Sequence, residues 1–328
     1  MSSASKPVLV VTRLLPSQAQ ARLDSLGDRL TITQHKSTEA MSRQELLTAV
    51  RGADGLVCLL SDRIDHELLS AAGERLKVVS TVSVGYDHVD LKALQTHGAL
   101  LGHTPDVLTD ATADTTALLA LMAARQAKRA LQLAMRGTAA FSLSTGLGCQ
   151  FTGKTLGIVG LGRIGAATAQ RLKPFGFAHV LYSAPRPQPE RECLLDARHV
   201  DFDELLRRSD LVCICCPLNS HTWGMFDAAA FASMKPSAIL VNTARGAIVD
   251  QNALLSALDQ GLLAHAALDV TVPEPLPADH PLVVHPRCTV LPHIGSATEE
   301  ARNAMGNLAI DNALAGIYGE PLPAQVHL

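Results

Sequence analysis

The sequence predicts an α/β protein with two doubly wound parallel-sheet domains, and three observations support this prediction. Short apolar segments alternate with helical segments, as they do when helices connect parallel strands and cover both faces of a sheet. One long helical segment interrupts the alternation, which then begins again. The length of 328 residues exceeds what one ordinary core holds and suits two domains.

The elements of the first series follow from the local pattern, taken in chain order. Short apolar runs predict strands, and the segments between them predict helices. Strands are expected at 7–12, 30–35, 55–60, 76–82 and 99–104, with helices at 17–27, 42–52, 65–73 and 89–98. Residues 107–137 are expected to form one long helix, with Thr109 or Asp110 as its N-cap.

A second series of elements follows the long helix. Strands are expected at 154–160, 179–183, 210–216, 238–243, 265–270 and 288–293, again with helices between them. The final segment, 296–319, is helical and has no strand partner of its own. Its simplest use is to pack on the first unit, which would make that domain discontinuous.

Composition narrows the class of function. Apolar residues make up 47% of the chain, charged residues 18%, and the formal net charge is -3, which argues against disorder and against a nucleic-acid-binding surface. No apolar run approaches the roughly 20 residues that span a bilayer, and the N-terminal segment lacks a signal-peptide pattern. We therefore expect a cytoplasmic protein with neither nucleic-acid nor membrane partners.

The seven cysteines are an odd count in a large chain, which predicts reduced thiols. Cys213 and Cys216 have the C-x-x-C spacing of metal and redox sites. They fall in an expected buried strand, where residues three apart point to opposite faces, and no second cysteine pair completes a tetrahedral site. We therefore expect no metal site.

A glycine-rich turn predicts dinucleotide binding. Gly160, Gly162 and Gly165 have G-x-G-x-x-G spacing, after an expected strand and before an expected helix. Gly160 would permit the tight turn, Gly162 the approach of a pyrophosphate, and Gly165 close packing of helix on strand. The N–H groups at the start of the helix would face the anion.

The next expected strand bears on the choice of cofactor. An acidic residue normally ends this strand and binds the adenosine ribose, but here Ser183 stands at that position and Arg186 follows. A hydroxyl and a guanidinium suit a 2′-phosphate, so NADP(H) is favoured over NAD(H), which stays possible. The alternative is that Arg186 simply points to water from a surface loop.

Three polar residues lie at the carboxyl ends of three successive expected strands. Arg245 and Glu274 follow the strands at 238–243 and 265–270, and His293 ends the strand at 288–293. Ligands of open parallel sheets bind at the carboxyl ends of the strands. An arginine can bind a carboxylate or ketone oxygen, and a histidine beside a carboxylate can donate a proton. Together they predict a carbonyl reductase for acids.

These segments resemble those of a known family. Residues 153–165, 234–261, 266–277 and 290–298 are similar to the signature segments of the D-isomer-specific 2-hydroxyacid dehydrogenases. Residues 58–65, 80–88, 104–113 and 319–328 resemble the branch that reduces glyoxylate and hydroxypyruvate. The resemblance implies a Rossmann-type nucleotide domain, residues 107–298, inserted in a flavodoxin-like substrate domain, residues 1–106 and 299–328. It also implies a homodimer built largely on the nucleotide domain.

The resemblance further implies an activity, the NADPH-dependent reduction of glyoxylate to glycolate and of hydroxypyruvate to D-glycerate. His293 would be the acid/base catalyst and Glu274 its partner. Substrate contacts are expected from Leu59, Ser83, the backbone N–H groups of Val84 and Gly85, Arg245 and His293. Cofactor contacts are expected from Thr109, Gly160, Gly162, Arg163, Ile164, Gly165, Ser183, Arg186, Cys216, Pro217, Thr243, Ala244, Arg245, Asp269, His293 and Gly295.

The sequence departs from the family pattern at two places. Asp114 stands where relatives usually have a longer glutamate, and residues 135–153 lack the tryptophans that relatives carry there. In relatives that region helps form the dimer contact and borders the partner's substrate pocket, so substrate preference and dimer geometry stay open.

Two other functions stay open as well. One is an NAD(H)-dependent D-2-hydroxyacid dehydrogenase with another substrate preference. The other is a non-catalytic corepressor-like protein that binds NAD(P)H and recruits partners, because the same fold serves in such proteins. Those corepressors usually carry extra tails, whereas few residues precede the first expected strand here, so an enzyme is expected.

Overall fold

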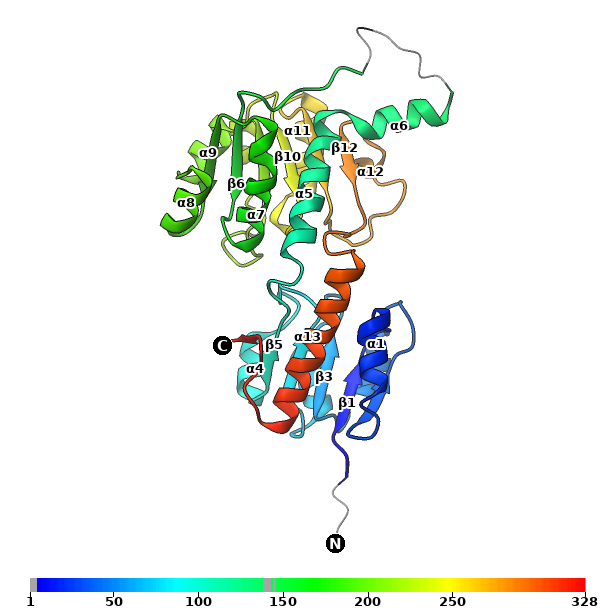
Figure 1. Ribbon diagram of the computed structural model, residues 1–328. Helices are drawn as coiled ribbons and strands as arrows, with labels where there is room; N and C mark the ends of the chain where they lie inside the picture. Colours follow the sequence, from blue (N-terminus) through cyan, green and yellow to red (C-terminus); the bar gives the residue numbers. More distant parts are fainter. Residues whose placement is uncertain (1–4, 138–142, 144–145, 328) are drawn as a thin grey trace. The chain divides into compact units, whose positions relative to one another are not determined.

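The computed structural model describes residues 5–137, 143 and 146–327 (Figure 1). The chain divides into two compact units, one made of Met1–Leu108 and Ala297–Leu328, the other of Thr109–Ser296. The chain therefore leaves the first unit and returns to it with its last helix. Each unit contains a largely parallel sheet with helices on both faces, which confirms the predicted fold class.

The first unit has a sheet with strand order β13-β5-β4-β3-β1-β2. Neighbouring strands are parallel except at one edge, where β13 runs antiparallel to β5. The strands are β1 (Val8–Val11), β2 (Thr31–Gln34), β3 (Gly55–Cys58), β4 (Val78–Thr81), β5 (Leu100–Gly102) and β13 (Gln325–Val326). The helices are α1 (Ser17–Asp24), α2 (Arg43–Ala49), α3 (His66–Ala72), α4 (Leu91–His97) and α13 (Glu299–Tyr318).

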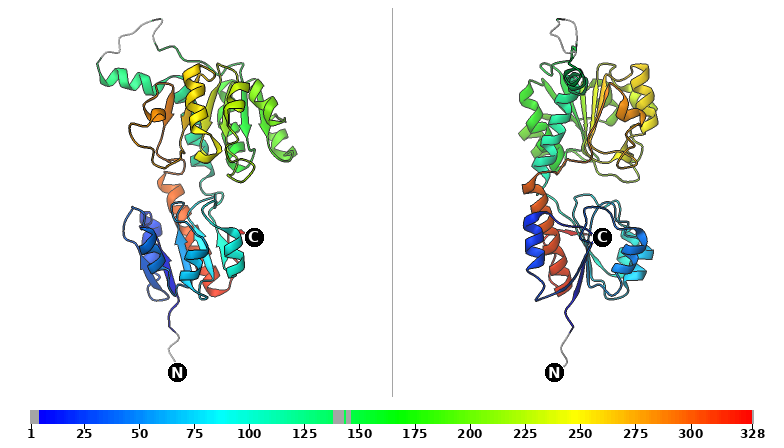
Figure 2. Two further views of the ribbon diagram at one scale, coloured as in Figure 1. Left: turned by 180° about the vertical axis from the view of Figure 1, so that it is seen from behind. Right: turned by 90° about the vertical axis from the view of Figure 1, so that its right-hand side faces the viewer.

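Helices cover both faces of this sheet (Figure 2). Leu68 of α3 and Leu94 of α4 belong to the hydrophobic cluster on one face, and Ile310 of α13 belongs to the cluster on the other. Helix α13 approaches β4 so closely that a Cβ atom at Gly316 would lie 2.5 Å from Val78 Cβ. The last helix thus packs on the first unit, as the sequence predicts.

The second unit has a parallel sheet with strand order β12-β11-β10-β9-β6-β7-β8. The strands are β6 (Thr155–Val159), β7 (His179–Ser183), β8 (Ala197–His199), β9 (Leu211–Ile214), β10 (Ile239–Asn242), β11 (His265–Leu268) and β12 (Cys288–Val290). Strand β6 lies between β7 and β9, so the direction in which the sheet grows reverses there. Ligands of such sheets bind beyond the carboxyl ends of the strands at this reversal.

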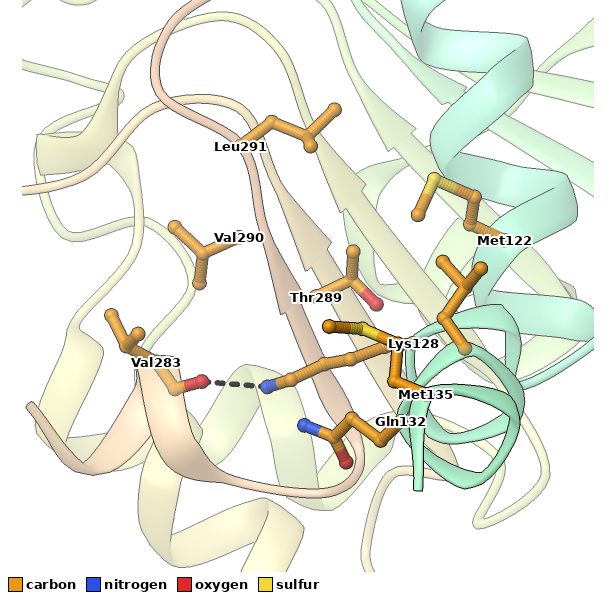
Figure 3. A pocket seen from close by; sticks show the side chains of 9 residues that line it. Met122, Lys128, Gln132, Met135, Val283, Thr289, Val290 and Leu291 are labelled. Carbon is orange, nitrogen blue, oxygen red and sulfur yellow. Dashed lines mark hydrogen bonds between the residues drawn. The ribbon is translucent and has the colours of Figure 1, made fainter. Parts of the chain in front are cut away.

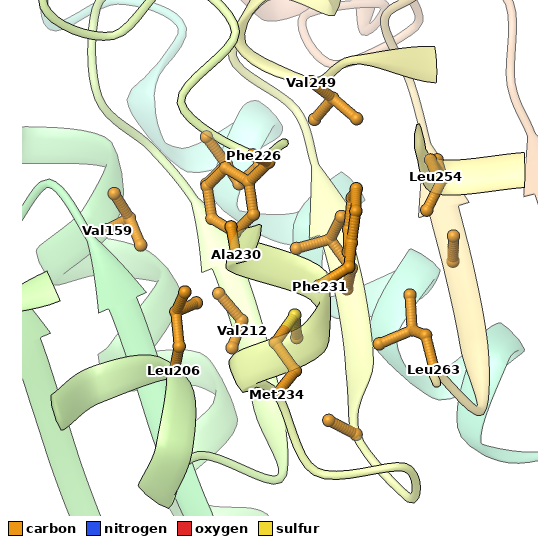
Figure 4. Packing of buried hydrophobic residues seen from close by; sticks show 14 of the residues in the cluster. Val159, Leu206, Val212, Phe226, Ala230, Phe231, Met234, Val249, Leu254 and Leu263 are labelled. Atoms are coloured by element: carbon orange, nitrogen blue, oxygen red, sulfur yellow. The ribbon is translucent and has the colours of Figure 1, made fainter. Parts of the chain in front are cut away.

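Helices pack on both faces of the second sheet, except for α6, which has no buried residue. The helices of this unit are α5 (Thr109–Ala124), α6 (Ala127–Met135), α7 (Arg163–Leu172), α8 (Pro189–Leu195), α9 (Phe202–Arg208), α10 (Ala228–Ser233), α11 (Gln251–Gln260) and α12 (Pro281–Val284), with short 3-10 turns at Lys173–Phe175 and Gly246–Ile248. Phe226 and Phe231 lie in the core of one face (Figure 4), and Leu119 of α5 lies in the core of the other. Within the described residues, no helix is long and apolar enough to cross a membrane.

The prediction of one long helix over 107–137 is wrong, because the chain forms two helices there, α5 and α6. Gln126 adopts a left-handed backbone conformation, with φ +50°, and its side chain donates to the Leu147 carbonyl. Beyond the break, Lys128 Nζ donates to the carbonyl oxygens of Val283, His285 and Cys288. These contacts with distant segments set the direction of α6, and the local sequence contains no glycine or proline to indicate the break.

Two short strands are also missing from the sequence-based expectation. Residues 197–199 read Ala-Arg-His, without the apolar run that predicts a strand, and form β8 because they pair with β7 at the sheet edge. Strand β13 forms where Val326 pairs with Leu101. Both strands are created by an available sheet edge rather than by their own sequence pattern.

Candidate active site

The glycine-rich turn connects β6 to α7 and requires glycine at two positions. Gly160 has φ +95°, and a Cβ atom there would lie 2.8 Å from the backbone nitrogen of Cys216. A Cβ atom at Gly165 would lie 2.1 Å from the Gly160 carbonyl oxygen. The turn is therefore packed against the segment after β9 on one side and against its own helix on the other.

Gly162 differs from the other two glycines because its missing side chain leaves open space. A Cβ atom there would meet no other atom within 4 Å. Gly162 is the N-cap of α7 and supplies no side-chain hydrogen bond to the helix start. The first N–H groups of a helix have no intrahelical acceptor, and the space beside Gly162 gives an anion access to the start of α7, so this arrangement fits the pyrophosphate of a dinucleotide.

The end of β7 carries no acidic side chain. Ser183 is half-buried, and Arg186 is exposed and forms no hydrogen bond or ion pair within the described residues. The structure also reveals a second arginine that the sequence pattern does not single out. Arg191 of α8 donates a 2.7 Å hydrogen bond to the carbonyl of Leu161, inside the glycine-rich turn.

The His293 and Glu274 side chains form a hydrogen-bonded pair beyond β12 and β11. The distance between His293 Nδ1 and Glu274 Oε2 is 2.8 Å. The other carboxylate oxygen, Oε1, accepts a hydrogen bond from the backbone N–H of Thr271 at 2.9 Å. An ionised carboxylate can only accept, so Nδ1 carries the shared proton and Nε2 remains for a ligand.

Several groups determine the ionisation of Glu274. Partial burial raises the pKa of its carboxyl. Three other groups lower it: His293 through a hydrogen bond and its charge, Thr271 through its backbone N–H, and Arg245 through its positive charge. Together they hold the pKa below the usual value. The influence of Arg245 also shows that the three strand-end side chains lie close enough to interact electrostatically. Glu274 is therefore the ionised partner in this group.

Backbone contacts hold Arg245 and His293 in place. Asn242 Nδ2 donates to the Arg245 carbonyl at 2.9 Å, and its Oδ1 accepts from the N–H of Ala244 at 3.0 Å. On the other side, the His293 N–H donates to the Asp269 carbonyl at 2.8 Å. The Asp269 carboxylate accepts from the backbone N–H groups of Ile294 and Gly295, while burial raises its pKa.

The structure places the other residues expected to contact the cofactor at the same edge of the second sheet. Because its strands are parallel, their carboxyl ends share that edge. These residues are Arg163 and Ile164 at the start of α7, Cys216 and Pro217 after β9, Thr243 and Ala244 after β10, and Gly295 after β12. Thr109 begins α5, and Thr115 of this helix contacts the Gly295 carbonyl.

In the first unit, the residues expected to bind substrate lie beyond neighbouring strands. Leu59 follows β3, whereas Ser83, Val84 and Gly85 follow β4. The Leu59 N–H donates to the carboxylate of Asp62 at 2.8 Å. The N–H groups of Val84 and Gly85 donate to no other group in the part of the chain that the structure describes.

Asp114, which replaces the usual family glutamate, lies on the exposed side of α5. Its carboxylate forms an ion pair with Arg171 of α7, which also contacts Asp110 at 2.7 Å. The shorter side chain thus still connects two helices. Residues 138–142, 144 and 145 of the tryptophan-free region lie outside the described residues.

A glycine-rich turn at the reversal of a doubly wound sheet is typical of dinucleotide-binding domains, and the polar residues beyond β10, β11 and β12 fit the oxidoreductases among them. The family description "D-isomer specific 2-hydroxyacid dehydrogenase, NAD binding domain" matches residues 117–295. The chain belongs to this family.

Individual relatives agree with this membership over the full chain. The glyoxylate reductase/hydroxypyruvate reductase of Homo sapiens is 43% identical over 97% of each chain. The glyoxylate/hydroxypyruvate reductase B of Escherichia fergusonii is 41% identical over 96% of each. Both relatives are named as reductases of glyoxylate and hydroxypyruvate.

Solved structures show the same fold. The TT0316 protein from Thermus thermophilus superimposes with a TM-score of 0.90 at 42% identity, covering 98% of this chain and 100% of that one. The NADPH-dependent glyoxylate/hydroxypyruvate reductase from Sinorhizobium meliloti, in complex with NADP and malonate, has a TM-score of 0.84 at 28% identity, covering 98% and 97%.

Proposed function

We propose that this protein reduces glyoxylate to glycolate and hydroxypyruvate to D-glycerate, with NADPH as the preferred reductant. The observation that carries the proposal is the His293–Glu274 pair, with its 2.8 Å hydrogen bond and the charge of Arg245 nearby. The names of the human and E. fergusonii relatives support the choice of these keto acids.

The proposed chemistry divides among a few side chains. Bound NADPH supplies the hydride. His293 donates the proton from Nε2 to the ketone oxygen, and the Glu274 carboxylate stabilises the protonated imidazole before transfer. Arg245 binds the substrate and stabilises the negative charge that develops on the ketone oxygen. The backbone N–H groups of Val84 and Gly85 bind the substrate carboxylate.

The cofactor would bind to the second unit. We assign residues 107–298 to the dinucleotide and residues 1–106 with 299–328 to the substrate. The open space at Gly162 supports binding of the pyrophosphate at the start of α7. Ser183 and the exposed Arg186 would bind the 2′-phosphate that distinguishes NADPH from NADH.

We further propose a cytoplasmic homodimer in which α6 forms part of the interface. No residue of α6 is buried in the single chain, and Leu131 and Met135 expose 59% and 87% of their surface. They border a mainly apolar cavity of about 330 Å³ (Figure 3), which is lined also by Met122, Lys128, Gln132, Val283, Thr289, Val290 and Leu291. The free cysteines support a reducing compartment.

One assay tests the catalytic proposal. The purified protein is mixed with NADPH or NADH and with glyoxylate, hydroxypyruvate or pyruvate, and cofactor oxidation is followed by absorbance. The expected result is turnover with the first two acids and a higher kcat/KM with NADPH. Binding of NADPH without turnover of any acid would support a non-catalytic protein, and a preference for NADH would contradict the cofactor assignment.

A further inference from the structure

The loop of residues 82–88 has its peptide groups fixed by contacts with the rest of the first unit. The Ser83 carbonyl accepts a hydrogen bond from the Thr104 N–H at 2.8 Å, and the Val84 carbonyl contacts His103 Nδ1 at 3.0 Å. The next carbonyl, that of Gly85, accepts from Ser83 Oγ at 2.6 Å. Three consecutive carbonyl groups are therefore held in defined directions.

These contacts also determine where the N–H groups of the loop point. In a planar trans peptide, the C=O of one residue and the N–H of the next point in opposite directions. The contact to the Ser83 carbonyl thus orients the Val84 N–H, and the contact from His103 orients the Gly85 N–H. Since a carbonyl oxygen can only accept, His103 must carry a proton on Nδ1.

Proton counting assigns a second histidine to the same loop. Ser83 has one hydroxyl proton and donates it to the Gly85 carbonyl. The hydroxyl oxygens of Thr81 and Ser83 are 2.8 Å apart, so Thr81 must be the donor in that hydrogen bond. Thr81 has then used its only proton, so in the 3.1 Å contact between Thr81 Oγ1 and His88 Nε2 the histidine must donate. A directional series of hydrogen bonds thus runs from His88 through Thr81 and Ser83 to Gly85.

Both histidines are held by the backbone around them. The His88 carbonyl accepts from the Ile64 N–H at 3.0 Å, beside the isolated bridge between Ile64 and Val89. The His103 carbonyl accepts from Asn312 Nδ2 of α13 at 2.9 Å. Thr81 and Ser83 are buried, with exposed fractions of 0% and 4%, so little water competes for their hydrogen bonds.

We propose that His103 and His88 are positioning residues for the loop of residues 83–85, whose N–H groups face the substrate carboxylate. His103 orients the Gly85 N–H through the contact of its Nδ1–H with the Val84 carbonyl. His88 acts through its Nε2–H on the Thr81–Ser83 series, which holds the Gly85 carbonyl and so restricts rotation about the backbone of this glycine. This inference rests on the proposed function, because it assumes that the loop binds the carboxylate of a keto acid. Neither histidine touches the substrate.

The two roles need a donor at different ring positions, which makes a sharp test possible. The amide nitrogen of asparagine replaces Nδ1 of histidine, whereas that of glutamine replaces Nε2. The variants His103→Asn and His88→Gln should therefore keep KM for hydroxypyruvate close to that of the unchanged protein. His103→Gln, His88→Asn and the leucine variants at both positions should raise KM about tenfold, since a misdirected N–H loses part of a hydrogen bond to a charged group.

Three further measurements separate positioning from folding and from the proposed function. NADPH affinity and melting temperature are measured for every variant, and nitrogen-15 NMR of labelled histidine reports which ring nitrogen carries the proton. We expect unchanged NADPH affinity and a proton on Nε2 of His88 and Nδ1 of His103. Equal KM values for the asparagine and glutamine variants at either position, or the opposite tautomers, would overturn the inference. An unchanged protein that binds NADPH but reduces no keto acid would instead contradict the proposed function.

Discussion

At the scale of single residues, the central feature is the contact between His293 and Glu274. The carboxylate accepts from both the imidazole and the Thr271 N–H, so its position and its ionisation are determined together. Reduction of a ketone places negative charge on the oxygen in the transition state. A proton donor and a cation act most strongly at that stage, and the two side chains should therefore differ in the kinetic constants that they affect.

Replacement of His293 and Arg245 should have distinct consequences. His293→Ala should lower kcat by about 10²–10⁴-fold, with NADPH affinity nearly unchanged, because general acid catalysis is lost. Arg245→Ala should impair both KM and kcat, since the guanidinium also binds the ground state. Steady-state kinetics measures both, and His221→Ala serves as a control because this histidine is exposed and distant in sequence from the pair. A normal kcat in the His293 variant would contradict the assignment.

The Glu274 carboxylate should determine the alkaline limit of activity. Reduction requires protonated His293, so the rate falls as the pH rises and the imidazole loses its proton. The hydrogen bond and the charge of His293 lower the pKa of Glu274, so an ionised carboxylate lies beside the imidazole. Glu274→Gln removes the negative charge and should move the alkaline limit to lower pH in a profile of kcat/KM against pH. If the limit stays in place, Glu274 has a structural role only.

Arg186 should discriminate between the two cofactors. Arg186→Ala should weaken NADPH binding by roughly 1.5–3 kcal/mol, the range for hydrogen bonds to charged groups, and leave NADH binding nearly unchanged. Fluorescence titration with both cofactors measures the difference, and Arg198→Ala is the matched control because Arg198 is also exposed. An equal loss for NADPH and NADH would show that Arg186 does not bind the 2′-phosphate.

At the scale of elements, two glycines of the turn between β6 and α7 have different expected roles, one in cofactor binding and one in stability. Gly162 borders open space, whereas a side chain at Gly165 would collide with the Gly160 carbonyl at 2.1 Å. The backbone of Gly162 is extended, a conformation that any residue adopts. Replacement by alanine is thus expected to affect cofactor binding at Gly162 and stability at Gly165.

Gly162→Ala should leave the melting temperature nearly unchanged and weaken NADPH binding about tenfold or more, because the methyl group would occupy the space of the pyrophosphate. Gly165→Ala should lower the free energy of unfolding by about 1–3 kcal/mol, since the helix must move away from the turn. Thermal denaturation and cofactor titration of both variants make the comparison. Loss of stability in the Gly162 variant would count against the open space as the binding site.

At the scale of the whole molecule, substitutions in α6 test whether the protein forms the proposed homodimer. Its exposed Leu131 and Met135 should be covered by a second copy of the chain, because burial of such side chains is favourable by about 1.5–3 kcal/mol each. The double variant Leu131→Glu with Met135→Glu should sediment with the mass of one chain, whereas the unchanged protein should have the mass of two. Leu194→Glu, at an exposed leucine of α8, is the control. A double variant that remains a dimer would place the interface elsewhere.

The sequence by itself determined which segments are buried and which residues follow the strands. Apolar runs such as 211–214 and 239–242 become strands because burial depends mainly on the residues themselves, and the parallel order then places Arg245, Glu274 and His293 at one edge. Tertiary structure alone decided the break between α5 and α6, the edge strands β8 and β13, and the contact from His103 to the Val84 carbonyl. These features depend on hydrogen-bond partners that lie far away in the chain, and a local pattern contains no information about such partners.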